Sequence, residues 1–199
     1  MTVPTIYYIR HGETAWNAAG RFQGTQDIPL NDLGRTQAVA AGGILADLIA
    51  RDGHEASALP FVASPLGRAR LTMELVRETM QLPPDGYALD IRLREIAYGL
   101  WEGLTLPEME RHDAVVFASR LADKWGVAAP AGETYASVTL RMREWFDSLQ
   151  GDTVTVAHGG TMRALMVALG IATPLEASDI PIGQGVVYVF REGTLTRHG

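Results

Sequence analysis

Cysteine is absent from this chain of 199 residues. Its absence excludes disulfide bridges, zinc–thiolate sites and a cysteine nucleophile. No apolar run is long enough to span a bilayer, and residues 1–4 (Met-Thr-Val-Pro) lack the basic start and long apolar stretch of a signal peptide. The sequence therefore predicts a cytoplasmic protein without a membrane partner.

Positive charge is also scarce, because 17 Lys and Arg residues face 23 Asp and Glu residues, for a formal net charge of −6. No basic stripe or arm is present, which argues against a nucleic-acid partner. A few well-placed arginines can still form a positive pocket in an acidic protein. A small anionic ligand is thus compatible with this charge, whereas a nucleic acid is not.

The order of apolar and polar stretches predicts an α/β fold. Short apolar runs at residues 6–9, 61–63 and 153–157 each end in a polar or glycine-containing turn and precede a helix-like stretch. Ligands bind at the carboxyl ends of such strands in open α/β sheets. We expect a three-layer α/β/α sandwich with a mainly parallel sheet, a late antiparallel hairpin strand and a small helical cap.

Further helices, a hairpin and a cap complete the expected single domain over residues 1–199. Ser64 and Pro65 suit the N-cap and first position of a helix that reaches about Met80. The other expected elements are helices over 33–49, 137–149 and 161–169, a hairpin of 185–190 with 194–196, and a cap over about 101–135.

The most informative stretch is Arg10-His11-Gly12, directly after the first predicted strand. A buried strand holds the histidine rigidly, and the glycine lets another group approach the backbone closely. The arginine offers a planar fork of donors suited to phosphate oxygens. The same tripeptide recurs at residues 197–199 without a following helix, so we assign no function to His198.

Other polar residues provide the context for this tripeptide. Arg68 lies in the first turn of a predicted helix, where free N–H groups attract anions, whereas we expect Arg70 to be a solvated charge. A short polar span after His11 adds Asn17, Arg21, Gln23 and Gly24.

Two later motifs supply candidates for proton transfer and anion binding. Transfer of a phosphoryl group requires protonation of the departing alkoxide, and the carboxyl group of Glu95 can supply the proton. Tyr98 follows in the same turn, while Glu102 is expected to be a structural partner near the cap. His158 and Gly159 follow the third predicted strand, so a second histidine is expected at the same edge of the sheet.

Together these motifs resemble the histidine phosphatase superfamily, in its phosphoglycerate mutase-like branch. The resemblance covers nearly the whole chain, from Arg10-His11-Gly12-Glu13-Thr14 and Ser64-Pro65-Leu66-x-Arg68-Ala69 through Glu95-x-x-Tyr98-Gly99 and Gly132-Glu133-Thr134 to His158-Gly159-Gly160. Where many relatives carry an asparagine before the late strand, this chain has Gln184 nearby, and we do not expect it to contact ligand.

The resemblance implies a phosphatase-type enzyme that hydrolyses a small phosphomonoester without a cofactor or metal. His11 would be the nucleophile and form a phosphohistidine. Arg10, Arg68 and a protonated His158 would surround the phosphoryl oxygens, with Asn17 as a further donor. Glu95 would act first as general acid and then as base for water.

Three alternatives are weighed against this hypothesis. A cofactor-dependent phosphoglycerate mutase would be expected to have lysine where this chain has Leu106, and a C-terminal tail that shields the intermediate from water. A non-catalytic binding module would be expected to lose His11 or Glu95. A metal-dependent hydrolase could use His11, His54, His112 and His158 as ligands, but the sequence has no two histidines at i, i+3 or i+4 spacing.

Substrate identity and oligomeric state stay open at this level, with a homodimer as one option. Trp101, Met109, Phe117 and Trp125 make the cap apolar. They suit an organic phosphomonoester, but they are expected first of all to form the core of the cap.

Overall fold

The computed structural model describes residues 3–199. The first two residues of the predicted domain, and with them the start of the stretch used to argue against a signal peptide, lie outside the described residues. One sheet of order β3-β2-β4-β1-β5-β6 forms the centre. Its strands are β1 (Ile6–Arg10), β2 (Phe61–Ala63), β3 (Ala88–Leu89), β4 (Thr153–Ala157), β5 (Val187–Arg191) and β6 (Thr194–His198).

The pairing of the strands confirms the predicted sheet. Strands β3, β2, β4 and β1 are parallel neighbours, whereas β5 pairs antiparallel with β1 and with β6. The three apolar runs form β1, β2 and β4, and the late hairpin is β5 with β6. Because β2, β4 and β1 are adjacent and parallel, their carboxyl ends lie side by side.

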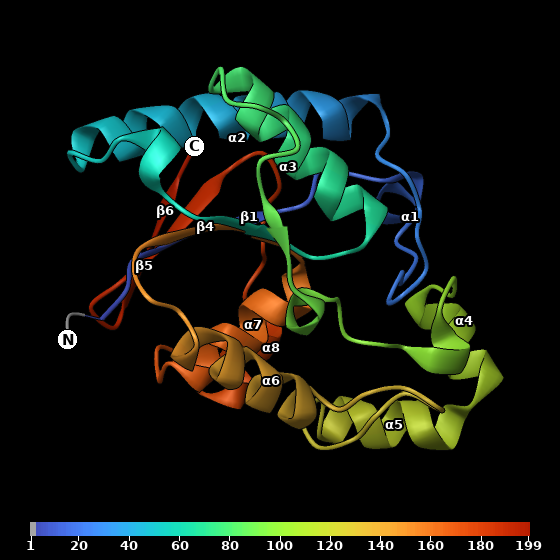
Figure 1. The fold of residues 1–199 in the computed structure, drawn as a ribbon. Helices are drawn as coiled ribbons and strands as arrows, with labels where there is room; N and C mark the ends of the chain where they lie inside the picture. The colour runs from blue at the N-terminus through green and yellow to red at the C-terminus, as the bar shows by residue number, and fades with distance from the viewer. Residues whose placement is uncertain (1–2) are drawn as a thin grey trace.

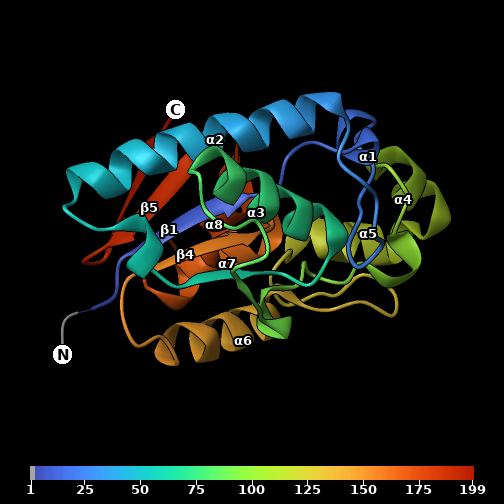
Figure 2. The same cartoon turned by 45° about the horizontal axis from the view of Figure 1, so that its top comes forward.

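Helices cover both faces of the sheet, as Figure 1 shows, with α2 and α3 on one face and α6 and α7 on the other. The turned view shows α2 and α3 next to each other on the near side of the sheet (Figure 2). The helices are α1 (Ala15–Ala18), α2 (Asp32–Arg51), α3 (Gly67–Thr79), α4 (Leu106–His112), α5 (Ala114–Ala122), α6 (Tyr135–Asp147), α7 (Gly159–Ala168) and α8 (Pro174–Asp179). Short 3₁₀ turns occur at Ala56–Ala58, Ile91–Leu93 and Gly99–Trp101.

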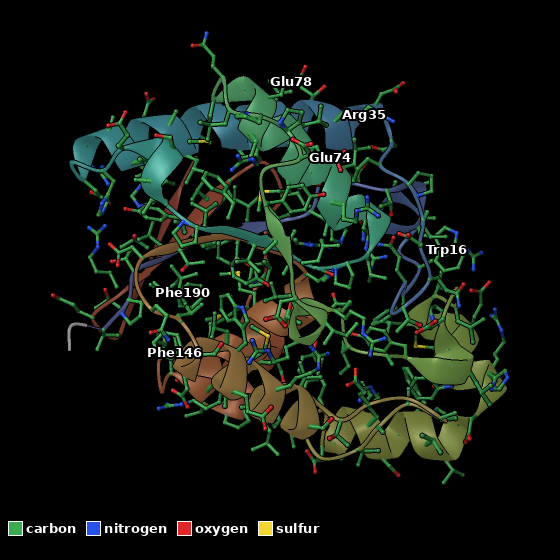
Figure 3. All side chains as sticks on the ribbon, viewed as in Figure 1. Trp16, Arg35, Glu74, Glu78, Phe146 and Phe190 are labelled. Atoms are coloured by element: carbon green, nitrogen blue, oxygen red, sulfur yellow. The ribbon has the colours of Figure 1, made fainter. Side chains whose placement is uncertain are left out.

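Two apolar cores follow from the alternation of side chains along the strands. Tyr7 and Ile9 of β1 pack in the core beneath α2 and α3, whereas Ile6 and Tyr8 pack in the core on the α6 and α7 side. Phe190 of β5 belongs to the second core and lies between the sheet and these helices (Figure 3). The predicted three-layer sandwich is confirmed.

The predicted N-cap of α3 is wrong. The helix begins at Gly67, after Leu66, which makes no side-chain cap hydrogen bond. Ser64 still belongs to the sheet edge, because its N–H donates to the carbonyl of Val156 at 3.0 Å. Its hydroxyl is therefore placed at the carboxyl end of β2 and is used elsewhere.

Helix starts explain two smaller differences from the predicted ranges. Helix α6 begins at Tyr135 because the Thr134 hydroxyl accepts from the Ser137 N–H at 3.0 Å. Helix α7 begins directly after His158, which occupies the N-cap position. The start of α7 thus lies at the same sheet edge as the strand-end residues. The predicted helical cap is confirmed as α4 and α5, which lie beside the sandwich (Figure 1).

Candidate active site

The ends of β1 and β4 bring the two candidate histidines together. Arg10 pairs with Ala157 in the parallel register, and the His11 N–H continues the ladder to the Ala157 carbonyl at 3.0 Å. His11 and His158 therefore lie on adjacent strands at the same level. Their ring centroids are 5.1 Å apart, and both residues are buried.

Backbone geometry fixes the tautomer of His11. Its Nδ1–H donates to the carbonyl of Gly12 at 2.7 Å, so Nε2 is the ring nitrogen that carries the in-plane lone pair. The Nε–H of Arg68 donates to that Nε2 at 3.3 Å. The imidazole thus presents a nucleophilic nitrogen that already faces a guanidinium group.

Arg68 is only 1% exposed, and hydrogen bonds hold its guanidinium group in place. Its Nη1 donates to the Gln26 carbonyl at 2.6 Å and its Nη2 to the Gly24 carbonyl at 2.8 Å. Gly24 has φ +53, and a Cβ there would overlap the carboxylate of Glu102. The loop conformation at Gly24 therefore positions the arginine.

His11 is kept neutral in this arrangement. Burial lowers the pKa of its imidazole well below the ordinary value, and the guanidinium groups of Arg68 and Arg10 lower it further. The hydrogen bond to Gly12 acts in the opposite direction. A neutral imidazole is the state in which Nε2 can attack an electrophile.

Arg10 and Glu95 complete the polar surroundings. Arg10 donates from Nη1 to the Ile182 carbonyl at 2.6 Å, while its buried Nε has no hydrogen-bond partner among residues 3–199. Glu95 accepts from the Ile96 N–H at 3.0 Å and from the Gly160 N–H, in the first turn of α7, at 3.2 Å. These two backbone contacts hold the Glu95 carboxyl group in place.

His158 belongs to a buried network that the sequence did not reveal. The Nε2 atom of its ring lies 2.7 Å from the Ser64 hydroxyl. Its backbone N–H donates to the hydroxyls of Tyr8 and Thr161, both at 3.1 Å. Its Nδ1 has no partner within the described part of the chain. Ser64 therefore orients the second histidine.

The protonation of His158 beside a phosphoryl group stays a prediction, and the surroundings of this imidazole oppose its positive charge. Burial lowers the pKa of its imidazole well below the ordinary value, and the positive charge of Arg68 is the next largest cause. The arginines therefore supply cationic charge at the site, and the same charge disfavours protonation of His158.

A cavity of about 230 Å³ opens beside His11. It is lined by ten of the eleven predicted site residues, which are Arg10, His11, Asn17, Arg21, Gln23, Gly24, Arg68, Glu95, Tyr98 and Gly159. His158 is the exception, because its side chain is fully buried behind the ring of His11.

The surrounding polar residues support one another rather than pointing freely into the cavity. Arg21 forms an ion pair with Glu108 of α4 at 2.8 Å and also donates to the Gly103 carbonyl. Asn17 accepts from Gln184 at 3.2 Å, and Gln184 also donates to the His11 carbonyl at 3.0 Å. Gln184 thus supports the nucleophile's backbone and the Asn17 side chain together.

The expected structural roles of two charged residues are confirmed. Glu102 accepts from the Thr25 N–H at 2.9 Å and from the Tyr98 N–H at 3.2 Å, so it ties the cap to the loop after α1. Arg70 is exposed on α3.

Histidines outside the cavity do not form a metal site. His54 pairs with Asp152 at 3.1 Å, and His112 is exposed on α4. His198 contacts Thr196 on β6. Among residues 3–199, no group of three or more His, Asp or Glu side chains is arranged to hold a metal ion. In the same range, no helix is both long and apolar enough to cross a membrane.

Sequence reasoning missed Ser64 and Arg163 as parts of the site. Arg163 lines the cavity from α7 and donates to the Ile180 carbonyl at 2.9 Å. For Ser64 a signal was available, because it follows β2 just as His158 follows β4, and the ends of adjacent parallel strands meet. Arg163 had no comparable signal, since its place depends on how α7 leaves the sheet.

Fold and site define an α/β phosphoryl-transfer enzyme with a strand-end histidine between two arginines. The model of the histidine phosphatase superfamily (branch 1) matches residues 6–194. The chain belongs to this superfamily, and the prediction of a phosphatase-type member is confirmed at the level of the family.

Individual relatives agree with this assignment. A glucosyl-3-phosphoglycerate phosphatase of Mycolicibacterium vanbaalenii is 35% identical over 199 residues, with 93% of this chain and 82% of the relative covered. A solved mycobacterial glucosyl-3-phosphoglycerate phosphatase in complex with VO3 has a TM-score of 0.78 and 30% identity, and covers 94% of this chain and 90% of its own. A 2,3-bisphosphoglycerate-dependent phosphoglycerate mutase of Gloeobacter violaceus is 28% identical, with 96% of this chain and 89% of the relative covered.

Proposed function

We propose that this enzyme hydrolyses a small phosphomonoester without a metal ion, through a phosphohistidine at His11. The observation that carries the proposal is the state of that imidazole. Nδ1–H is bound to the Gly12 carbonyl, and the lone pair of Nε2 is directed at Arg68 beside the cavity. A nucleophile and a cation for the transferred group are therefore next to each other before substrate arrives.

In the first step, Nε2 of His11 attacks phosphorus, a P–N bond forms and the P–O bond to the alcohol breaks. Glu95, in its protonated form, gives its proton to the departing oxygen. In the second step, Glu95 as carboxylate takes a proton from water, whose oxygen attacks phosphorus while the P–N bond breaks. The products are the alcohol and inorganic phosphate, and the enzyme returns to its starting state.

Stabilisation of the phosphoryl oxygens falls to Arg10 and Arg68, with Asn17 as an additional donor. The unpartnered Nε–H of Arg10 is free to donate to an oxygen that enters the cavity. His158 is assigned to the same group because its ring lies next to that of His11, with centroids 5.1 Å apart. A bound phosphoryl dianion raises the pKa of a neighbouring imidazole, so the substrate itself favours protonation of His158.

The remaining predicted residues are proposed to shape the cavity around the phosphoryl group. Gly24 acts through its carbonyl, which holds Arg68, and Gly159 supplies the start of α7. Arg21, Gln23 and Tyr98 line the walls. For Arg21 the pairing with Glu108 supports a role in joining the cap to the site.

A phosphoglycerate mutase is the second candidate, because several relatives carry that name, and the match covers 89% of one of them. Leu106 begins α4 at the position where a lysine would be expected in a mutase. Leu106 is an apolar, half-exposed side chain and cannot bind a carboxylate. Hydrolysis is therefore preferred to transfer between two positions of a phosphoglycerate.

The deciding experiment is hydrolysis of p-nitrophenyl phosphate in EDTA by the wild type and by His11→Ala. Activity that survives EDTA and disappears in the variant supports the proposal. Activity that the substitution leaves unchanged rules out His11 as the nucleophile. A silent wild type that interconverts phosphoglycerates when bisphosphoglycerate is added favours the mutase.

Three broader expectations accompany this function. We propose a single domain over residues 1–199 in which 101–135 acts as the cap, a cytoplasmic location, and a homodimer. Cooperative unfolding monitored by two probes tests the first, cell fractionation the second, and light scattering after size-exclusion chromatography the third.

A further inference from the structure

A second, larger cavity of about 510 Å³ lies next to the catalytic cavity, between the cap and α8. Phe22 and Tyr98 line both cavities. Their rings make an edge contact with centroids 4.8 Å apart. The two cavities therefore adjoin at this pair of aromatic side chains, and the larger volume falls in the range of small-molecule sites.

The larger cavity has an apolar lining. Trp101, Met109, Phe117 and Trp125 contribute to its walls. Charged side chains also line it: Arg120, which donates to the Val127 carbonyl, and Lys124, whose Nζ donates to the Ser178 carbonyl at 2.7 Å, together with Asp123 and Asp179. The aromatic and aliphatic side chains make the surface of the cavity mainly apolar.

The rim of the cavity is also apolar, although it faces water. Leu106 of α4, Leu121 of α5 and Leu175 of α8 all line it and are 51%, 69% and 79% exposed. Large apolar side chains on three elements around one opening are costly to leave in water and are typical of a binding site. A ligand that reaches the rim would cover them.

We infer that the substrate has a bulky apolar alcohol or phenol portion, which passes Phe22 and Tyr98 and fills this second cavity. The inference rests on the proposed function, since it requires the phosphoryl group to be bound beside His11. It favours phosphate esters of hydrophobic alcohols and phenols over esters of small polar alcohols.

The test compares kcat/KM for 4-biphenylyl phosphate with kcat/KM for phenyl phosphate. The two leaving groups are phenols of similar acidity, so their ratio reports binding of the second ring rather than chemistry. An additional ring buries roughly 80 Å² of apolar surface, which predicts a ratio of at least about tenfold in the wild type.

Three substitutions make the test specific to the cavity. Leu121→Glu and Leu175→Glu place a charge on opposite walls and should each lower the ratio at least fivefold. Val115→Glu is the matched control, because Val115 is 77% exposed on the same helix as Leu121 but does not line the cavity. It should leave the ratio unchanged.

The possible outcomes distinguish failure of this inference from failure of the proposed phosphatase function. A wild-type kcat/KM ratio near one overturns the inference, and so do equal effects of Leu121→Glu and Val115→Glu on that ratio. Hydrolysis of both esters would still support the proposed phosphatase activity. Failure to hydrolyse either ester counts against the proposed function, and the inference then falls with it.

Discussion

At the scale of single residues, the site depends on contacts that prepare each group before substrate binds. The Gly12 carbonyl fixes the tautomer of His11, and the Ser64 hydroxyl orients His158. Glu95 is held differently, by two backbone N–H groups, one of them in the first turn of α7. It is the carboxylate that lines the catalytic cavity, which makes it the group whose removal is most informative.

Glu95→Gln tests proton delivery to the leaving group. An alkyl phosphate needs a proton on the departing oxygen, so its kcat/KM should fall at least ~100-fold. The p-nitrophenolate ion leaves without help, so kcat/KM for p-nitrophenyl phosphate should fall far less. The measurement is kcat/KM of both esters, because this parameter covers the steps up to departure of the leaving group.

Glu78→Gln serves as control for this prediction. Glu78 is exposed on α3 and points away from the molecule (Figure 3). Its replacement should leave kcat/KM unchanged for both esters. Equal losses for the two esters in Glu95→Gln would show that the carboxylate positions substrate and does not deliver the proton.

At the scale of elements, helix α2 supports the nucleophile loop through backbone contact. A Cβ on Gly34 would overlap the N and O atoms of Glu13, and one on Gly12 would overlap the carbonyl of Gly34. Asn31 also donates from its N–H to the Glu13 carbonyl at 2.9 Å. The start of α2 and the loop that carries His11 therefore approach as closely as two backbones can.

Gly34→Ala should consequently destabilise the protein by about 1–3 kcal/mol, because backbone must shift to admit the methyl group. It should also lower kcat, since the shift displaces His11. Gly43→Ala in the same helix meets no atom within 4 Å and should stabilise by about 0.5–1 kcal/mol through helix propensity. Urea unfolding and p-nitrophenyl phosphate turnover measure both effects. A Gly34→Ala protein as stable as Gly43→Ala would show that the loop and helix can separate freely.

Elements were predictable from the sequence where periodicity and strand-end polarity agree. Runs 61–63 and 153–157 coincide with β2 and β4. The start of α3 was not, because Ser64 and Pro65 satisfy the local rule for a helix start. The tertiary demand of His158 for the Ser64 hydroxyl, together with the ladder bond to Val156, outweighed that local preference. Local propensity yields when a buried polar group needs a partner.

At the scale of the whole molecule, the sheet order converts separate motifs into one site. Residues 10, 64 and 158 are distant in sequence, yet β1, β4 and β2 are neighbours. Pattern alone predicted which residues lie at strand ends. It did not predict the cavity between the cap and α8, because that space depends on how α5 with Phe117, the turn with Trp125 and α8 with Leu175 are placed around it.

Burial of two neutral histidines in one site should make stability depend on pH. The folded-state pKa of His11 and of His158 is well below the ordinary value of about 6.5, mainly through burial. Below pH 6.5 the unfolded chain therefore binds protons that the folded protein excludes. The free energy of unfolding should fall as pH drops from 7 to 5.5, by up to about 1.4 kcal/mol per pH unit for each group.

Urea unfolding at pH 7.0, 6.5, 6.0 and 5.5 measures this slope, in a range above the titration of ordinary carboxylates. His11→Gln removes one of the two groups and should reduce the slope by about half, whatever its effect on stability at pH 7. His112→Gln alters an exposed histidine of α4 and should leave the slope as in the wild type. A wild-type free energy that is flat from pH 7 to 5.5 would mean that the folded protein takes up protons at these imidazoles. The nucleophile would then lose its lone pair in mild acid, and hydrolysis should fail over the same pH interval.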